Sequence, residues 1–540
     1  MTDAAPSGPA GPLPPSPTPP ARRGAFTRFL DGVEWLGNLL PHPVTLFAVL
    51  AIGMVFLSGL FGALGLSVED PRPLGAPGRS EDGMITAVSL LNGEGLRRIF
   101  TGMVGNFTGF APLGVVLVAM LGIGVAEKSG LLSATVRAMV LSASPKVVTV
   151  VIVFAGVISN TAAEVGYVVL IPLAGAVYYS LGRHPLAGMA AAFAGVSGGY
   201  SANLLIGTID PLLAGITEEA AQLIDPTYTV TATASYFFMV VSTLLVTVVG
   251  SLVSLFIVEP KLGAYDASRA DPSVLKEDGA APLTTPERKG LAAAGLALLA
   301  VLGLMALTLL PEWGVLRDPE TGDQLRSPFF SGFAVWILLF FLAVGFAYGR
   351  VVGTVRNDRD IIDGMASGLS TLGLYLVIVF FAAQFVAFFN WSNLGAITAV
   401  KGAAWLQETG MTGPAVFAGF ILICAFVNLM IGSASAQWAL TAPIFVPMLM
   451  LIGYSPEVIQ TAYRIGDSTT NIITPMMSYF GLILAWASRY DKQVGIGTMI
   501  AMMLPYTIFF TLAWSALFFV WVFGLDLPVG PGSPTFYTPG

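Results

Sequence analysis

The sequence predicts an all-α integral membrane protein, and three observations support this fold class. Of the 540 residues, 55% are hydrophobic and only 11% are charged, whereas soluble domains carry about 25% charged residues. The mean hydropathy is +0.79. Apolar stretches of about twenty residues recur along the chain, and that is the length of a helix that crosses a bilayer. Helices satisfy their own backbone hydrogen bonds in lipid, whereas a barrel would show short alternating strands.

The composition also excludes several classes of function. The single cysteine, Cys424, lies in an apolar run, so we expect neither a disulfide framework nor a thiolate metal site. The net charge of -7 is carried by loops, and nothing in the pattern indicates nucleic-acid binding. GVSGG at 195–199 matches G-x-S-x-G but lacks the strand-turn-helix setting of a hydrolase nucleophile. No H-E-x-x-H or Walker A sequence occurs, so we expect no enzyme, no ATP-driven step and no cofactor apart from a coupling ion.

Residues 1–28 are expected to form a disordered, Pro-rich cytoplasmic tail. The tail begins MTDAAPSGPAGPLPPSPTPP, which lacks the charged-then-apolar order of a cleavable signal peptide. Arg22, Arg23 and Arg28 precede the first span. The positive-inside rule therefore places the N-terminus in the cytoplasm.

Residues 29–258 are expected to form the first half of the molecule. A span near 43–65 is followed by a polar loop to about 105 and a second span near 110–127. Between Lys146 and Arg183 the only charge is Glu164, and this interval is too short for two crossings of about twenty residues each. It predicts a helical hairpin near 146–182 that enters and leaves the membrane on one side.

A broken helix is predicted just after this hairpin. Residues 195–215 mix Gly, Ser, Asn and an Asp-Pro pair into an apolar segment, which is typical of the interrupted helices that form transporter binding sites. Residues 259–289 carry five basic residues and predict a cytoplasmic linker between two halves.

The second half, 290–523, repeats the style of the first. A long uncharged block contains NLMIGSASAQW, whose small hydroxyl residues predict a second hairpin near 413–453. A second broken segment follows, and in it TTNIITP at 469–475 resembles SANLLIG at 201–207, with Asn203 over Asn471. Paired interruptions of this kind predict an inverted repeat. The final residues, 524–540, are expected to form a short tail.

The stretch YRIGDSTTNIITP contains Arg464 and Asp467 in an otherwise charge-poor region. A charge at membrane depth costs at least about 2.5 kcal/mol, so each needs a partner or water. The two residues are three positions apart, so on a helix they could neutralise each other. The alternative is a site in a non-helical stretch whose hard oxygen ligands suit Na⁺, or whose carboxylate carries a proton. Its ligands would be Asp467, Ser468, Thr469 and Asn471.

Other polar residues are candidate ligands with plausible structural roles. Asp210 precedes Pro211, which is also an ordinary helix start. Trp438 could stack on an aromatic substrate or belong to an interfacial belt. The uncharged candidates, whose hydroxyls could instead bond a carbonyl one turn back, are Asn160, Thr161, Asn203, Asn428, Ser433 and Ser435.

Three motifs resemble the p-aminobenzoyl-glutamate (AbgT) transporter family. They are YSANLLIGTIDPLLAGITEEAAQLIDP at 200–226, GSASAQWALTAPIFVPML at 432–449 and AYRIGDSTTNIITPMMSYFGLIL at 462–484. The resemblance covers nearly the whole chain after the tail. It implies a homodimer in a bacterial inner membrane, each subunit with about nine spanning helices and two re-entrant hairpins. It also implies import of p-aminobenzoyl-glutamate or export of sulfonamide antimetabolites, driven by an ion gradient of Na⁺ or H⁺.

The resemblance further implies which residues function. The family's functional positions fall on Asp210, Asn428, Ser435, Trp438, Pro456, Arg464, Asp467 and Pro475. In that picture the arginine binds a carboxylate or sulfonyl oxygen, Trp438 meets the aminobenzoyl ring, and Asn428 with Asp467 holds the cation.

Two alternatives stay open at this point. SNT at 159–161 is similar to sodium-coupled dicarboxylate symporters of like architecture. A channel is less expected, because it favours continuous pore-lining helices. The direction of transport, the coupling ion and the substrate are not fixed by these residues.

Overall fold

A computed structural model describes residues 43–72, 79, 82–162, 166–270, 282–324 and 327–537. Within these ranges, eight helices are long and apolar enough to cross a membrane, which confirms the all-α membrane fold. The count of nine spans stays a prediction. The predicted N-terminal tail and Glu164 lie outside the described residues, as do residues 271–281 of the linker.

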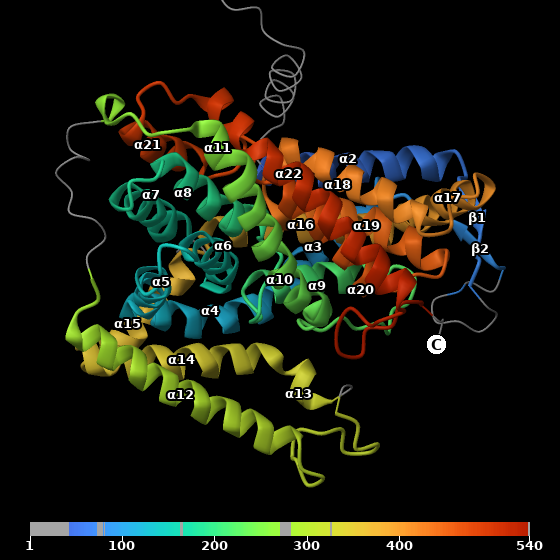
Figure 1. The fold of residues 1–540 in the computed structure, drawn as a ribbon. Coiled ribbons are helices and arrows are strands. Elements are labelled where there is room, and N and C mark those ends of the chain that lie inside the picture. The colour runs from blue at the N-terminus through green and yellow to red at the C-terminus, as the bar shows by residue number, and fades with distance from the viewer. Residues whose placement is uncertain are drawn as a thin grey trace, which may run out of the picture.

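The first half contains ten helices of widely different length among the described residues (Figure 1). They are α2 (Pro43–Ala63), α3 (Gly93–Thr108), α4 (Ala111–Ser129), α5 (Leu131–Leu141), α6 (Val148–Ser159), α7 (Ile171–Ser180), α8 (Pro185–Phe193), α9 (Ile209–Ala221), α10 (Tyr236–Val253) and α11 (Glu259–Leu262). Short π- or 3₁₀-helical segments are Asn160–Ala162, Gly166–Leu170, Ala194–Gly198, Ser254–Val258 and Ala267–Arg269.

The second half begins after the linker. Its helices are α12 (Thr285–Leu309), α13 (Pro328–Ser331), α14 (Phe333–Val352), α15 (Asp358–Ser370), α16 (Gly373–Trp391), α17 (Leu394–Glu408), α18 (Ala415–Ile431), α19 (Ala434–Leu451), α20 (Pro456–Thr470), α21 (Phe480–Tyr490) and α22 (Ile496–Phe518), which a π segment, Phe519–Gly524, extends. The spans predicted near 43–65 and 110–127 match α2 and α4 to within a few residues.

The polar loop predicted to run to about 105 is wrong in part. It contains an antiparallel pair, β1 (Ser67–Glu69) and β2 (Met84–Thr86), and then α3. Asn92 caps α3 by accepting from the Gly95 N–H at 2.7 Å. Mean hydropathy misses this helix because it is amphipathic: Arg98 lies over the ring of Trp391 on α16 while Ile99 is buried.

The molecule divides into a peripheral group and a central group of helices. In Figure 1, α12 and α14 lie side by side along one edge, with α4 and α15 next to them. We call α4, α12, α14 and α15 the scaffold, and α6–α10 with α18–α22 the core. Small residues permit the close packing of the scaffold: a Cβ on Gly124 of α4 would lie 2.5 Å from the Gly364 carbonyl oxygen of α15.

Two pairs of short helices occupy the positions of the predicted hairpins. α6 has 12 residues, so it is about 18 Å long and shorter than the hydrocarbon core of a bilayer. In the second half, α18 and α19 are joined by a tight turn at Gly432, which has a φ of +58°. Their entering the membrane from one side only stays a prediction.

Both predicted breaks are present. Residues 199–208 are irregular between the π segment that follows α8 and α9, and residues 471–479 are irregular between α20 and α21. One expectation is wrong: Asp467, Ser468 and Thr469 lie inside α20 and not in a non-helical stretch. Ser468 and Thr469 form hydrogen bonds from within the helix, so these polar residues do not require α20 to unwind.

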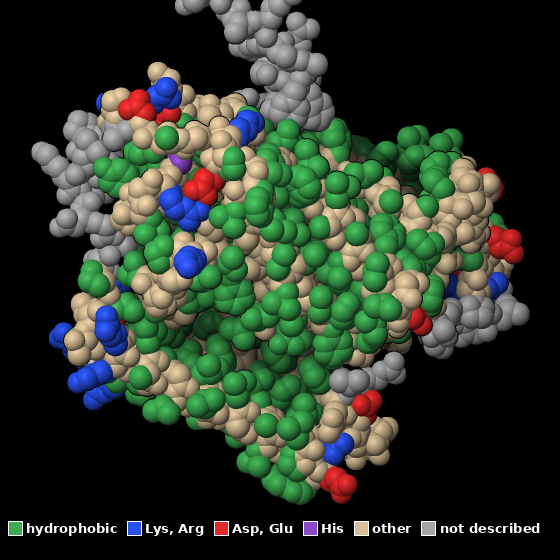
Figure 2. Space-filling view, in the orientation of Figure 1, with side chains coloured by type: hydrophobic (Ala, Val, Ile, Leu, Met, Phe, Trp, Pro, Cys, Tyr) green, Lys and Arg blue, Asp and Glu red, His purple; other side chains and the backbone are tan. Residues whose placement is uncertain are grey.

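The surface has a charge pattern typical of a membrane protein. In Figure 2 a broad apolar region separates two ends that carry the charged side chains. Basic residues predominate near the start of α12, and acidic residues are visible at the opposite end of the molecule.

Candidate functional site

α20 brings most of the candidate residues together. It begins with Ser455 as N-cap and Pro456 at the first helical position, where proline's missing N–H costs nothing. All 15 of its residues are buried. Pro475 lies in the irregular stretch after it, where a proline prevents the helix from continuing.

Arg464 pairs with Asp210 and not with Asp467. One guanidinium nitrogen donates to Asp210 Oδ1 at 2.5 Å, and the two side chains are 4% and 2% exposed. The other carboxylate oxygen accepts from the Gly207 N–H at 2.7 Å. Asp210 is therefore not the N-cap of α9, a position that Thr208 occupies. The helical spacing of Arg464 and Asp467 permitted their pairing, but the second half uses an acid from the first half instead.

Asp467 is a buried carboxylate without such a partner. Among the described residues, no group donates a hydrogen bond to either of its carboxylate oxygens. The hydroxyl of nearby Tyr463 uses its one hydrogen on the Ala434 carbonyl at 2.6 Å. With Arg464 already neutralised by Asp210, Asp467 is the uncompensated acid of this centre, and an uncompensated buried charge is costly unless a cation or a proton neutralises it.

Asn428, at the end of α18, holds the C-terminal end of α20. Its amide nitrogen lies 2.6 Å from the Asp467 carbonyl oxygen, 3.0 Å from Thr470 Oγ1 and 2.9 Å from Asn471 Oδ1. Its amide oxygen is buried and accepts from none of the described residues. Unpartnered amide and carboxylate oxygens are the kinds of ligand that a small hard cation takes.

The first half contains a related arrangement without a charge. Thr161 donates to Asn203 Oδ1 at 2.9 Å, and the Asn160 amide nitrogen lies 3.4 Å from the Gly199 carbonyl oxygen. The amide oxygen of Asn160 also lacks a partner among the described residues. Gly199 precedes Asn203 by four residues, as Asp467 precedes Asn471.

Two further predicted cation ligands have other contacts. Ser468 Oγ accepts from the Ser201 N–H at 3.1 Å, which joins α20 to the broken segment of the first half. Thr469 donates to the Ile465 carbonyl one turn back at 2.9 Å, which is the ordinary structural role of a helical threonine.

Trp438 is buried inside the protein and not at a membrane interface. Its ring stacks on Tyr463 with centroids 4.3 Å apart, and its N–H donates to Thr217 Oγ1 at 2.9 Å. Trp438 on α19 therefore packs against Tyr463 of α20, next to the charged centre.

A cavity of about 340 Å³ lies between the scaffold and the core. Four predicted residues line it, namely Asn160, Ser433, Ser435 and Asn471. Asp210, Arg464, Asp467, Trp438 and Asn428 do not. The predicted residues therefore separate into two groups: those of the cavity wall and those of a buried charged centre behind it.

Sequence reasoning missed the aromatic part of this cavity. Four tyrosines and one acid line it: Tyr167, Tyr200, Tyr375, Tyr479 and Glu127. Tyr167 follows the first hairpin turn and stacks on Tyr479, which precedes α21, with centroids 4.6 Å apart and planes 8° apart. The sequence feature that could have indicated them is a tyrosine close to each polar stretch of the first half: Tyr167 after SNTAAE and Tyr200 before SANLLIG. No Lys, Arg or His side chain lines the cavity.

Comparison with known proteins gives a consistent result over nearly the whole chain. The sequence profile of the AbgT putative transporter family matches residues 28–537. The chain is 36% identical over 500 residues to the p-aminobenzoyl-glutamate transport protein of Escherichia coli strain K12, covering 93% of this chain and 95% of that protein.

Two solved structures share the fold. The structure of Neisseria gonorrhoeae MtrF, reported with a class of antimetabolite efflux pumps, has a TM-score of 0.88 and 58% identity, covering 94% of this chain and 100% of that one. The Alcanivorax borkumensis YdaH transporter has a TM-score of 0.84 and 47% identity, covering 91% and 100%.

Proposed function

The chain belongs to the AbgT putative transporter family, and from this premise we propose that it is an ion-coupled carrier of compounds that contain a p-aminophenyl ring. Its substrates are p-aminobenzoyl-glutamate, sulfonamide antimetabolites or both. The observation that supports ion coupling is Asp467, whose buried carboxylate has no hydrogen-bond partner of normal geometry among the described residues. Arg464 and Tyr463 lie near it, but Arg464 forms its ion pair with Asp210 and Tyr463 donates to Ala434. A cation or proton that binds at Asp467 lowers the cost of the buried charge.

The cavity chemistry supports an aromatic amine as the shared part of the substrates. Tyrosine rings give stacking surfaces for a p-aminophenyl ring, and Tyr167 and Tyr479 already form such a surface. Amide and hydroxyl groups of Asn160, Ser433 and Asn471 line the same space and suit the amine and the carbonyl or sulfonyl oxygens. The substrate's glutamate carboxylates find no basic residue in this cavity.

Arg464 is the basic residue that we propose binds such a carboxylate. It is held by Asp210, so a substrate carboxylate must compete with that aspartate to reach it. An arginine fork suits a carboxylate or a sulfonyl group equally. Loading of the charged centre by a cation and exchange of the arginine between Asp210 and the substrate would link ion and substrate binding.

The setting of the protein follows from the same premise. The basic residues near the start of α12 in Figure 2 support a cytoplasmic location for that end under the positive-inside rule, and the N-terminus is proposed to be cytoplasmic from the sequence. We further propose residence in the inner membrane of a bacterium as a homodimer, with the lipid bilayer and the small-molecule substrate as the other partners.

Transport by purified protein in proteoliposomes tests this function. Uptake and counterflow of p-aminobenzoyl-glutamate, a sulfonamide and succinate are measured under separate Na⁺ and proton gradients. We expect p-aminobenzoyl-glutamate, the sulfonamide or both to accumulate under one of the gradients. Transport of succinate alone would instead favour a sodium-coupled dicarboxylate symporter, to which the Asn160 and Thr161 tip is similar. Fast flux that needs no gradient would favour a channel.

A further inference from the structure

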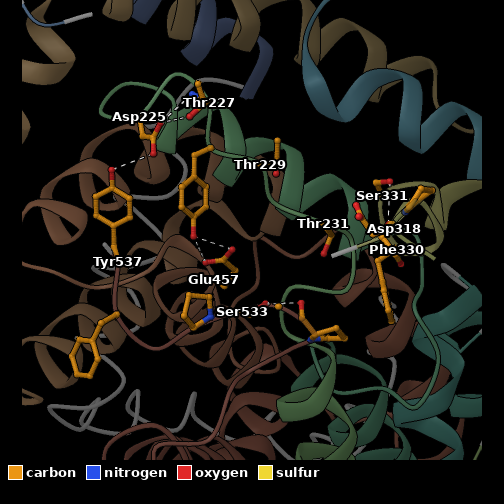
Figure 3. A pocket seen from close by; sticks show the side chains of 17 residues that line it. Asp225, Thr227, Thr229, Thr231, Asp318, Phe330, Ser331, Glu457, Ser533 and Tyr537 are labelled. Carbon is orange, nitrogen blue, oxygen red and sulfur yellow. Dashed lines mark hydrogen bonds between the residues drawn. The ribbon is translucent and has the colours of Figure 1, made fainter. Parts of the chain in front are cut away.

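A second cavity, of about 570 Å³, lies at the N-terminal end of α20, away from the substrate cavity (Figure 3). We call it the acidic pocket. Its walls come from residues 225–231 between α9 and α10, from Asp318 and α13 ahead of α14, and from the C-terminal segment 531–537. Three carboxylates line it, those of Asp225, Asp318 and Glu457, and none of its lining residues is Lys, Arg or His.

The carboxylates of this pocket are held in place by neighbouring groups. Tyr228 donates to Glu457 at 2.9 Å, and Tyr537 lies 3.3 Å from Asp225, as Figure 3 shows. Asp318 accepts from the Thr321 N–H and hydroxyl. Two arginines near the pocket are bound elsewhere: Arg72 to Asp70 at 2.6 Å, and Arg317, which precedes Asp318, to the Gly322 and Pro311 carbonyls. A cleft lined by one sign of charge concentrates ions of the opposite sign, so this pocket attracts cations.

A continuous polar face runs along α20 from this pocket to the charged centre. The residues that form it recur every three or four positions and lie within an arc of about 120° on a helix of 3.6 residues per turn. They are Glu457, Gln460, Thr461, Arg464, Asp467, Ser468 and Asn471, and all of them are buried.

The middle of this face is polar but carries no net charge. Gln460 accepts from Thr217 at 2.6 Å, and Thr461 lies 2.8 Å from Ser235 Oγ while bonding the Glu457 carbonyl at 2.7 Å. Arg464 is neutralised by Asp210. The face therefore has an acid at each end, Glu457 and Asp467, separated by ten residues or about 15 Å, with hydroxyl and amide groups between them.

We propose that the acidic pocket collects the coupling cation and that the polar face of α20 conducts it from Glu457 to Asp467. This inference rests on the ion-coupled transport proposed above. It gives the cation a route separate from the substrate cavity, along the contact between the two halves, since Thr217, Asp210 and Ser235 all belong to the first half. Hydroxyl and amide groups between two carboxylates serve either a proton or Na⁺.

The competing explanation is that this face only holds the two halves together. A structural role predicts that its variants lose stability and every transport mode together. A conducting role predicts that they lose gradient-driven accumulation of substrate but keep substrate counterflow, which needs no net movement of the cation.

The test uses the full-length protein in proteoliposomes with labelled p-aminobenzoyl-glutamate. Gradient-driven accumulation and counterflow are measured for the wild type, Glu457→Gln and Thr461→Val, under a Na⁺ gradient at equal pH and under a pH gradient without Na⁺. Glu320→Gln is the matched control, because it removes an exposed carboxylate two residues from Asp318 that does not line the pocket. Thermal unfolding of each purified variant identifies any general loss of stability.

We expect Glu457→Gln and Thr461→Val to lose accumulation in whichever arm drives the wild type and to retain counterflow, while Glu320→Gln retains both. Full accumulation by Glu457→Gln, an equal loss in Glu320→Gln, or parallel loss of counterflow and stability would overturn the route. If the wild type shows counterflow but no accumulation under either gradient, the ion coupling of the proposed function is itself wrong.

Discussion

In each half of the molecule an asparagine amide contacts the backbone carbonyl of the residue four positions before a second asparagine, but the two halves differ in charge. In the first half, Asn160 contacts the Gly199 carbonyl, four residues before Asn203. In the second half, Asn428 contacts the Asp467 carbonyl, four residues before Asn471. Each amide oxygen is left without a partner among the described residues.

This difference shows how one architecture can serve two purposes. Because the asparagine bonds a backbone carbonyl, the side chain at that position is free to vary. The first half cannot use this freedom, since a Cβ on Gly199 would lie 2.7 Å from the Gly195 carbonyl oxygen and 2.8 Å from Val157. The second half has space there for a carboxylate, and it adds Arg464 one turn earlier. The repeat thus supplies the frame, and the second half supplies the charge.

The largest effect is expected from Arg464→Met. This variant leaves the Asp210 carboxylate buried without its cation, and breaking a buried ion pair costs about 3–5 kcal/mol. Thermal unfolding in detergent should show a large loss of stability. The double variant Arg464→Met with Asp210→Leu should recover most of it, because no charge is then left unpaired. A single variant as stable as the wild type would contradict the pairing across the two halves.

A smaller and graded effect is expected when the two asparagines are compared. Asn428→Ala removes a group with three close contacts, and Asn160→Ala removes a single contact of 3.4 Å. An amide nitrogen has two hydrogens, so Asn428 donates at most two hydrogen bonds. At about 1 kcal/mol for each buried hydrogen bond, the first variant should cost about 2 kcal/mol and the second about 1 kcal/mol. Equal unfolding temperatures for the two variants would show that the second half is not the more tightly held.

The smallest effect is expected from Thr161→Val, which keeps the shape of the side chain and removes its hydroxyl. Asn203 Oδ1 loses one donor but still accepts from the Leu204 and Leu205 N–H groups. We expect a loss of about 0.5–1 kcal/mol in the same unfolding assay. A loss of stability as large as that of Asn428→Ala would contradict the expectation that the first half is held by weaker contacts.

Much of the fold could be predicted because the membrane signal depends on composition alone. The long apolar runs became α2, α10, α12, α14, α16 and α22. α3 was missed because its apolar residues lie on one face, so its mean hydropathy is low. The breaks at 199–208 and 471–479 were visible as polar residues and prolines inside apolar sequence.

Part of the site could be predicted because charged residues stand out in the composition of an apolar segment. Arg464 and Asp467 are conspicuous in a charge-poor segment, and their spacing left a pair between them open as one alternative. The actual partner, Asp210, is 254 residues away, and only the packing of α9 against α20 brings it close. The tyrosines of the cavity could not be separated from ordinary core aromatics, because only the fold shows that Tyr167 and Tyr479 meet.

The most direct test of charge-coupled transport is Asp467→Asn in proteoliposomes. The asparagine keeps the shape of the side chain, and the backbone contact of Asn428 with the residue 467 carbonyl is unaffected by the change. We predict that gradient-driven accumulation of p-aminobenzoyl-glutamate is abolished while counterflow persists. Accumulation at the wild-type level under the same Na⁺ or proton gradient would show that Asp467 does not carry the coupling ion.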